Sequence, residues 1–146
     1  MSNDKPFYLA GPMSGIPQFN FPLFYRATAD LRAAGYNIIS PAELDAQHGV
    51  DTQAMASKDG DASKLTQTWG DLLARDVKIV SDVAQGVIFL PNWWTSRGAK
   101  LEAFVALLNS HKFGVYLEGS SPLVSWIPAR QVMWQISEHM FGGLAK

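Results

Sequence analysis

Four short apolar runs, separated by helical patterns, constrain the fold of this chain more than any other feature. The runs are continuous rather than alternating, which is typical of parallel strands covered by helices on both faces. Strands that alternate with helices predict a doubly wound parallel sheet in the α/β class. The predicted strands are Phe7–Ala10, Tyr36–Ile39, Gly86–Leu90 and Phe113–Leu117.

The helical patterns complete this prediction. The first helix is expected to begin after Asn20 as its N-cap and to end before Gly35. We expect a Rossmann-like or flavodoxin-like sheet of four to five strands, flanked by helices. The polar stretch Asp45–Asp61 indicates a mobile loop or a short helical excursion. The predicted helices are Phe21–Ala34, Ser63–Ser81, Arg97–His111 and one from about Pro128 to just before Gly142.

Composition limits the possible partners. The 146 residues predict one domain, residues 1–146, and 47% apolar residues are enough to fill a core. A net charge of −1 without any run of Lys or Arg argues against nucleic acid as a partner. Cys is absent, and the three His residues share no metal-ligand spacing, so we expect no metal and no cofactor.

Targeting and membrane segments are also not expected. The first residues lack a basic stretch followed by an apolar core, so they do not resemble a signal peptide. No apolar run approaches the ~20 residues that span a membrane. The sequence therefore predicts a cytoplasmic protein without membrane contact.

The segment from Leu90 to Glu102 is the strongest candidate for chemistry. A buried strand, a turn and a helix start follow one another there, which is where open α/β sheets bind ligands. Glu102 is expected at the margin of an apolar stripe, and the helix dipole is expected to lower its pKa, as a nucleophilic carboxylate requires. The alternative is that Glu102 serves helix electrostatics alone. The expected stripe is Leu101, Phe104, Val105 and Leu108.

Asp76 is the second candidate. It lies within the apolar stripe of the predicted helix Ser63–Ser81, whereas Arg75 is expected to point away from that stripe. A carboxylate on a buried face is costly unless it is paired or has a function. The alternative is a structural carboxylate that caps a loop or pairs with an Arg such as Arg97.

Two further segments are candidates for ligand contact. In the turn from Tyr8 to Gly15, two glycines allow close approach to an anion or sugar, although the turn is compatible with an ordinary strand-to-helix connection. Trp93 and Trp94 follow the central strand, where they could stack on a base or sugar, or close the core.

Three of these segments, in this order, resemble the nucleoside 2-deoxyribosyltransferase superfamily. That group includes deoxynucleoside 5′-monophosphate N-glycosidases and short uncharacterised proteins that are frequent in phages and bacteria; this chain is most similar to the latter. The resemblance rests on Tyr-Leu-Ala-Gly-Pro-Met-Ser-Gly at 8–15, Ala-Arg-Asp at 74–76 and Leu-Pro-Asn-Trp-Trp-Thr-Ser-Arg-Gly-Ala-Lys-Leu-Glu at 90–102.

The resemblance implies a role for each matching residue. Glu102 would be the nucleophile that attacks C1′, Asp76 the acid for the departing base, and Tyr8 the residue that orients the nucleophile. A serine at position 96, instead of the carboxylate typical of the nucleoside transferases, favours a 5′-phosphate. The expected substrate-binding residues are Gly11, Ser14, Gly15, Trp93, Ser96, Arg97 and Gly98.

The expected activity is cleavage of the N-glycosidic bond, or deoxyribosyl transfer, on a 2′-deoxynucleoside 5′-monophosphate. Two alternatives stay open: a nucleotide-binding module without turnover, and a hydrolase of another ribosylated metabolite. The resemblance also implies a homodimer or higher homo-oligomer. The apolar, Trp-rich segment Pro122–Met140 is the expected contact surface.

Overall fold

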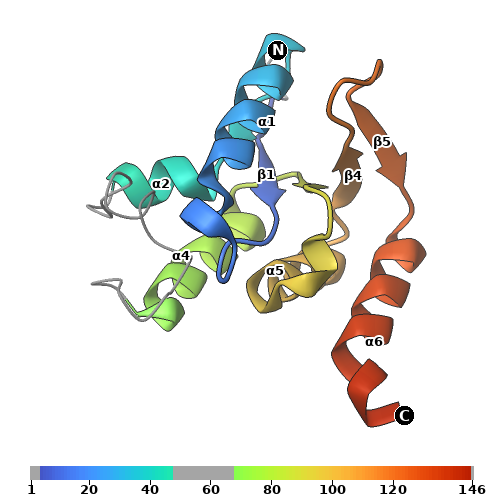
Figure 1. Cartoon of the computed structure of the whole chain (residues 1–146). Helices are drawn as coiled ribbons and strands as arrows, with labels where there is room; N and C mark the ends of the chain where they lie inside the picture. The colour runs from blue at the N-terminus through green and yellow to red at the C-terminus, as the bar shows by residue number, and fades with distance from the viewer. Residues whose placement is uncertain (1–3, 48–67, 146) are drawn as a thin grey trace.

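A five-stranded sheet forms the centre of the molecule, in the order β2-β1-β3-β4-β5 (Figure 1). The computed structural model describes residues 4–47 and 68–145. Strands β1 to β4 are parallel to one another, whereas β5 pairs antiparallel with β4. The predicted α/β class is confirmed, with an antiparallel edge strand added. The strands are β1 Phe7–Ala10, β2 Ile38–Ile39, β3 Gly86–Phe89, β4 Lys112–Tyr116 and β5 Val124–Ile127.

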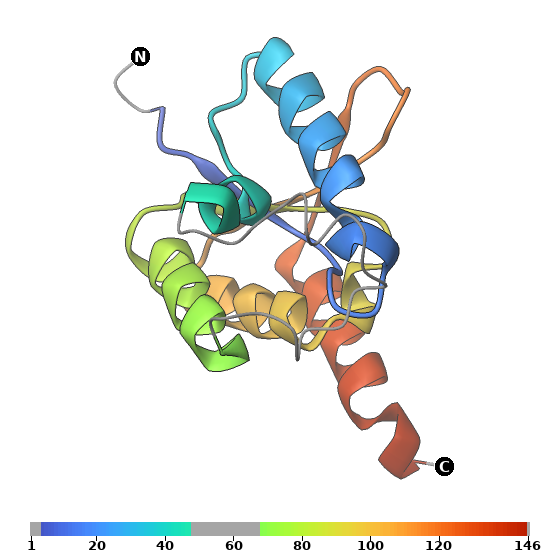
Figure 2. The ribbon, with the colours of Figure 1, turned by 60° about the vertical axis from the view of Figure 1, so that its left-hand side comes forward.

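Helices cover both faces of the sheet, which explains why the strands are apolar without alternation. In β1, Phe7 and Leu9 pack with α1, whereas Tyr8 and Ala10 face the core shared with α4, α5 and α6. Figure 2 shows the sheet between these two layers. The α-helices are α1 Phe21–Ala33, α2 Pro41–Gln47, α4 Trp69–Asp82, α5 Arg97–Leu108 and α6 Ala129–Ala145, and the 3₁₀ turns are η1 Pro17–Asn20 and η3 Trp93–Thr95.

Two helices have boundaries that differ from the predicted ones. Helix α4 begins at Trp69 because Thr68 and Asp71 form a reciprocal capping box, so the hydroxyl of Thr68 accepts from the backbone N–H of Asp71. The predicted start at Ser63 lies outside the described residues. Helix α6 continues through Gly142 and Gly143, where the sequence predicted its end.

Asn20 does not cap α1 through its side chain. Its backbone is left-handed, with φ 59°, and its amide Nδ2 donates to the carbonyl of Pro12 at 3.0 Å. This bond ties the start of α1 to the turn after β1. The predicted N-cap position is therefore confirmed, but the side chain fixes the turn that lines the candidate site instead of capping the helix.

Helix α2 and strand β5 are not among the helices and strands that the sequence predicts. Helix α2 includes Asp45, the first residue of the stretch predicted as a mobile loop or a short helical excursion; residues 48–61 of that stretch lie outside the described residues. Strand β5 was read only as part of an apolar C-terminal segment. Gly114 allows β5 to approach β4, since a Cβ at Gly114 would lie 2.5 Å from Cγ1 of Val124. In the described residues, no helix has the length and apolar character needed to cross a membrane.

Candidate active site at the ends of β1 and β3

A cleft opens where β1 and β3 end. From β1 the chain continues to β2 on one side, whereas β3 lies on the other, so the two strands form a topological switch point of the sheet. Open α/β sheets bind ligands at this position. Residues from β1 and its following turn, α2, α4 and α5 line the cleft: Tyr8, Gly11, Met13, Ser14, Phe19, Pro41, Asp45, Trp69, Leu72, Leu73, Asp76, Ser96, Gly98, Ala99 and Glu102.

Glu102 is buried beneath this cleft, where it forms a hydrogen bond with Tyr8. The Tyr8 hydroxyl donates to Glu102 Oε2 at 2.9 Å, and both residues are buried. Helix α5 turns Glu102 inward together with three alanines, whose small side chains let the helix lie close to the sheet. The predicted apolar stripe of this helix is wrong for Phe104 and Leu108, which are 46% and 71% exposed, whereas Val105 packs against the core. The buried residues of α5 are Ala99, Glu102, Ala103 and Ala106.

The pKa of Glu102 is raised well above its ordinary value of 4.5, mainly by burial and then by the negative charge of Asp76. The position of Glu102 near the start of α5 predicts instead a lowered pKa, through the helix dipole. That effect fades beyond the first turn, and Glu102 lies in the second, so burial outweighs it. Burial, followed by the charge of Glu102, likewise raises the pKa of Tyr8 well above its ordinary value. Tyr8 therefore stays a hydrogen-bond donor to Glu102.

Asp76 is buried on α4, facing the same cleft. The sequence predicted that Arg75 points away from the buried face of this helix, but it does not. Its Nε donates to Asp76 Oδ1 at 2.8 Å, and its Nη2 lies 2.8 Å from Asp45 Oδ1 on α2. Burial raises the pKa of Asp76 to about 6, although the charge of Arg75 opposes this shift. Glu102 and Asp76 thus share one cleft as titratable carboxyl groups in different surroundings.

A second cavity adjoins the cleft at the N-terminus of α5. It is lined by Pro12, Ser14, Gly15, Ile16, Trp69, Thr95, Ser96, Arg97 and Gly98. Ser96 caps α5, accepting from the backbone N–H of Ala99 at 3.1 Å. The guanidinium of Arg97 lies 4.3 Å from the centroid of the Trp69 ring rather than beside Asp76. A helix N-terminus with a nearby guanidinium favours an anion.

The structure thus brings together most of the predicted site residues. Tyr8, Gly11, Ser14, Asp76, Ser96, Gly98 and Glu102 line the cleft, and Gly15 and Arg97 line the adjoining cavity.

Trp93 is the exception. It is 2% exposed, stacks on Phe89 with ring centroids 4.0 Å apart, and lines neither cavity. Of the two expectations for this residue, the structure supports closure of the core. Trp94 packs beside Trp93 and His139.

Other residues of the cleft were missed from the sequence. Trp69 lines both cavities, and Met13 and Phe19 bring apolar surface from the turn after β1 and from η1. Asp45 adds a third buried carboxyl group. Trp69 is the first residue of an amphipathic helix, where a large apolar side chain is typical of packing and does not by itself indicate a ligand site. Asp45 has no sequence pattern that marks it as a site residue. Among residues 4–47 and 68–145, no group of three or more His, Cys, Asp or Glu side chains could hold a metal ion.

Comparison with known proteins identifies one family. Residues 5–113 of the 146 match the model of a domain of unknown function, DUF4406. This range covers β1 to the start of β4 and includes every residue that lines the two cavities. No curated protein and no solved structure matches the chain. The chain belongs to the DUF4406 family.

Proposed function

We propose that this protein cleaves the N-glycosidic bond of a 2′-deoxynucleoside 5′-monophosphate, by hydrolysis or by deoxyribosyl transfer. The observation that carries the proposal is the pair of buried carboxyl groups, Glu102 and Asp76, in one cleft with the Tyr8 hydroxyl bonded to Glu102. Paired carboxyl groups in unlike surroundings are the usual equipment for glycosidic bond cleavage. The resemblance to the nucleoside 2-deoxyribosyltransferase superfamily supports the same activity.

The proposed reaction has two steps. The carboxylate of Glu102 attacks C1′ of the sugar, the C1′–N bond breaks, and its electron pair leaves with the base, which takes a proton from Asp76. Water, or a second base, then gives a proton to the Asp76 carboxylate and attacks C1′; the ester bond to C1′ breaks and its electron pair leaves with Glu102 as a carboxylate. Tyr8 keeps the nucleophile in place through its hydrogen bond. The apolar walls formed by Met13, Phe19 and Trp69 suit the flat ring of a base.

A chromatographic screen for free base tests this proposal. The purified protein should release base from at least one deoxynucleoside monophosphate, and Glu102→Ala should abolish the release. Nucleotide binding without any base release would instead support a binding module. Release from ribonucleotides alone would support a hydrolase of another ribosylated metabolite.

Ser96 provides a test of the phosphate. An Asp at this position keeps the helix cap but adds a negative charge at the α5 N-terminus. Ser96→Asp should therefore raise KM for a monophosphate by at least ~10-fold, because the two anions repel, while KM for the matching nucleoside stays within about two-fold. Steady-state kinetics on the two substrates measures this difference. Ser96→Asn, an equally good cap without charge, is the control, and equal effects of both variants would contradict a phosphate subsite.

We also propose that two copies associate through α5 and α6. These helices pack against each other, yet each exposes large apolar side chains, including Leu108 on α5 and Trp134 on α6. Leu108→Glu should shift the sedimentation coefficient to that of a monomer. The same substitution at Leu117, which is exposed after β4, is the control. A wild-type protein that sediments as a monomer at micromolar concentration would contradict this association.

A further inference from the structure

Arg75 joins two carboxylates from different helices at the edge of the cleft. Its Nη2 lies 2.6 Å from Asp76 Oδ1 and 2.8 Å from Asp45 Oδ1, in addition to the Nε bond to Asp76. The side chain of Arg75 is 17% exposed, and those of Asp45 and Asp76 are 5% and 12% exposed. Ion pairs with this little solvent are screened far less than surface pairs. They act strongly on the charge and orientation of both carboxylates.

This arrangement distributes charge unequally between the two proposed catalytic groups. Asp76 contacts a guanidinium, whereas Glu102 accepts from the neutral hydroxyl of Tyr8. Within the described part of the chain, no Lys or Arg lies within ion-pair distance of Glu102. Before substrate binds, the negative charge therefore belongs on Asp76 and the proton on Glu102. The proposed reaction needs the opposite distribution, with Glu102 ionised and Asp76 protonated.

We propose that Arg75 is a positioning residue that fixes the Asp76 carboxylate and controls when Asp76 takes up the proton for the leaving base. This inference rests on the proposed function. Arg75 lines neither cavity, so it acts through Asp76 rather than on the substrate. Asp45 holds the other side of the guanidinium and so anchors Arg75 to α2.

Burial has the largest effect on the pKa of Asp76, and four groups from four elements act on it in addition. Arg75 on α4 favours the ionised form, as does the hydroxyl of Tyr8 on β1, whereas Asp45 on α2 opposes it. Glu102 on α5 is the fourth, since the charge of Asp76 raises the pKa of Glu102 and the interaction is mutual. Arg75 is the one cation of this group, so its removal should have the largest effect on Asp76.

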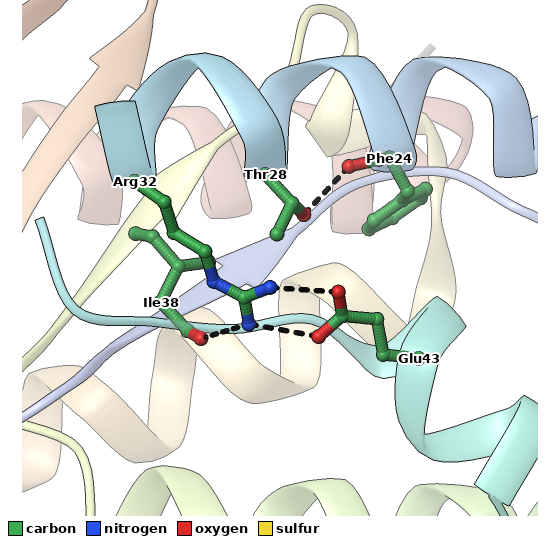
Figure 3. Close-up of polar contacts among 5 residues, drawn as sticks. All are labelled: Phe24, Thr28, Arg32, Ile38 and Glu43. Carbon is green, nitrogen blue, oxygen red and sulfur yellow. Dashed lines mark hydrogen bonds and ion pairs between the residues drawn. The ribbon is translucent and has the colours of Figure 1, made fainter. Parts of the chain in front are cut away.

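The test compares Arg75→Gln with a matched change at a second Arg that also holds α2. Arg32 on α1 donates from both terminal nitrogens to Glu43 on α2 and also to the carbonyl of Ile38, as Figure 3 shows. It lines neither cavity. Arg32→Gln therefore weakens the attachment of α2 without removing a charge from the cleft.

Two measurements follow the Asp76 carboxyl group: its titration by carbon-detected NMR, and the pH profile of kcat/KM for base release. In Arg75→Gln, the pKa of Asp76 should rise by roughly 1–3 pH units, because an adjacent guanidinium lowers a carboxyl pKa by about that amount. The limb of the profile that reports Asp76 should move the same way. In the free protein this is the acid limb, because Asp76 holds its proton less tightly than Glu102 does. Arg32→Gln should leave both unchanged.

Arg75→Lys separates charge from geometry. It keeps the cation but loses the Nε bond, so the titration of Asp76 should stay near that of the wild type while kcat falls. If Arg75→Gln does not fold, Arg75→Lys alone tests the proposal, because an unchanged kcat in Arg75→Lys would refute positioning by Arg75. An unchanged Asp76 titration in a folded Arg75→Gln with intact base release would refute it directly. A wild-type protein that releases no base at any pH would instead refute the proposed function.

Discussion

Glu102→Gln is expected to abolish base release and to stabilise the fold at neutral pH. The amide keeps the size of the side chain and can still accept from the Tyr8 hydroxyl, but it cannot form the ester to C1′. Loss of a nucleophile of this kind should lower kcat by at least ~10³-fold. The same change removes a carboxyl group from a buried position near Asp76, where its ionised form is costly.

The stabilisation should depend on pH in a defined direction. The raised pKa of Glu102 means that the folded protein holds this proton more tightly than the unfolded chain does. The contribution of Glu102 to the stability of the wild type is therefore fully present below pH 4.5, the ordinary pKa of a glutamate. It is lost as the pH rises through the folded-state pKa of Glu102. Glu102→Gln lacks this decrease, so its advantage should grow from pH 4 to pH 8.

Thermal unfolding at several pH values measures this advantage, and for a chain of this size each 1 kcal/mol corresponds to roughly 2–4 °C in Tm. Glu118→Gln, at an exposed carboxylate, is the control and should preserve both Tm and base release. A Glu102→Gln protein that is inactive but less stable at pH 8 than the wild type would contradict the burial argument. Full activity of that variant would contradict the nucleophile.

The sequence predicted the sheet well because its signal is local. Each parallel strand is a short continuous run of apolar residues, and β1 begins and ends where the sequence placed it, at Phe7 and Ala10. The runs also fix where the strands end, and therefore where the site residues that follow them must meet. Strand β5 carries no such signal, because Ser125 and Trp126 are exposed at the edge of the sheet.

The burial pattern of α5 could not be read from hydrophobicity. Its large apolar residues, such as Phe104 and Leu108, lie outward, and the face against the sheet consists of alanines and Glu102. Periodicity gives large side chains more weight than alanine, although close packing of a helix on a sheet favours small ones. Hydrophobicity therefore predicts Glu102 at the margin of the buried face of α5, although Glu102 lies in the middle of that face, among the alanines.

The partner of Asp76 also depends on tertiary structure. On an isolated helix, Arg75 points away from the apolar stripe, as the sequence predicted. In the folded chain α2 brings Asp45 to that side, so the guanidinium is enclosed between two carboxylates. Asp45 and Arg75 are thirty positions apart, and residues 48–67 between them showed no pattern that would place one beside the other.

Asp76→Asn should lower kcat/KM most for substrates whose base must be protonated to leave. The amide preserves the shape and can accept from Arg75, but it is no proton donor at neutral pH. An ordinary purine leaves with excess negative charge unless it is protonated, so its release should fall by about 10²–10⁴-fold. A 7-methylguanine base already carries a positive charge and leaves as a neutral molecule. Its release should fall by less than about 10-fold.

Single-turnover rates for the two substrates, measured with the same variant, give this comparison directly. Asp82→Asn, near the other end of α4, is the matched control, because Asp82 is exposed and pairs with Lys78 outside the cleft. It should leave both rates unchanged. Because both substrates share the sugar and phosphate, a misplaced sugar or a distorted cleft would slow both equally. An equal loss would therefore show that Asp76 shapes the cleft without giving a proton to the base, whereas a selective loss identifies it as the acid.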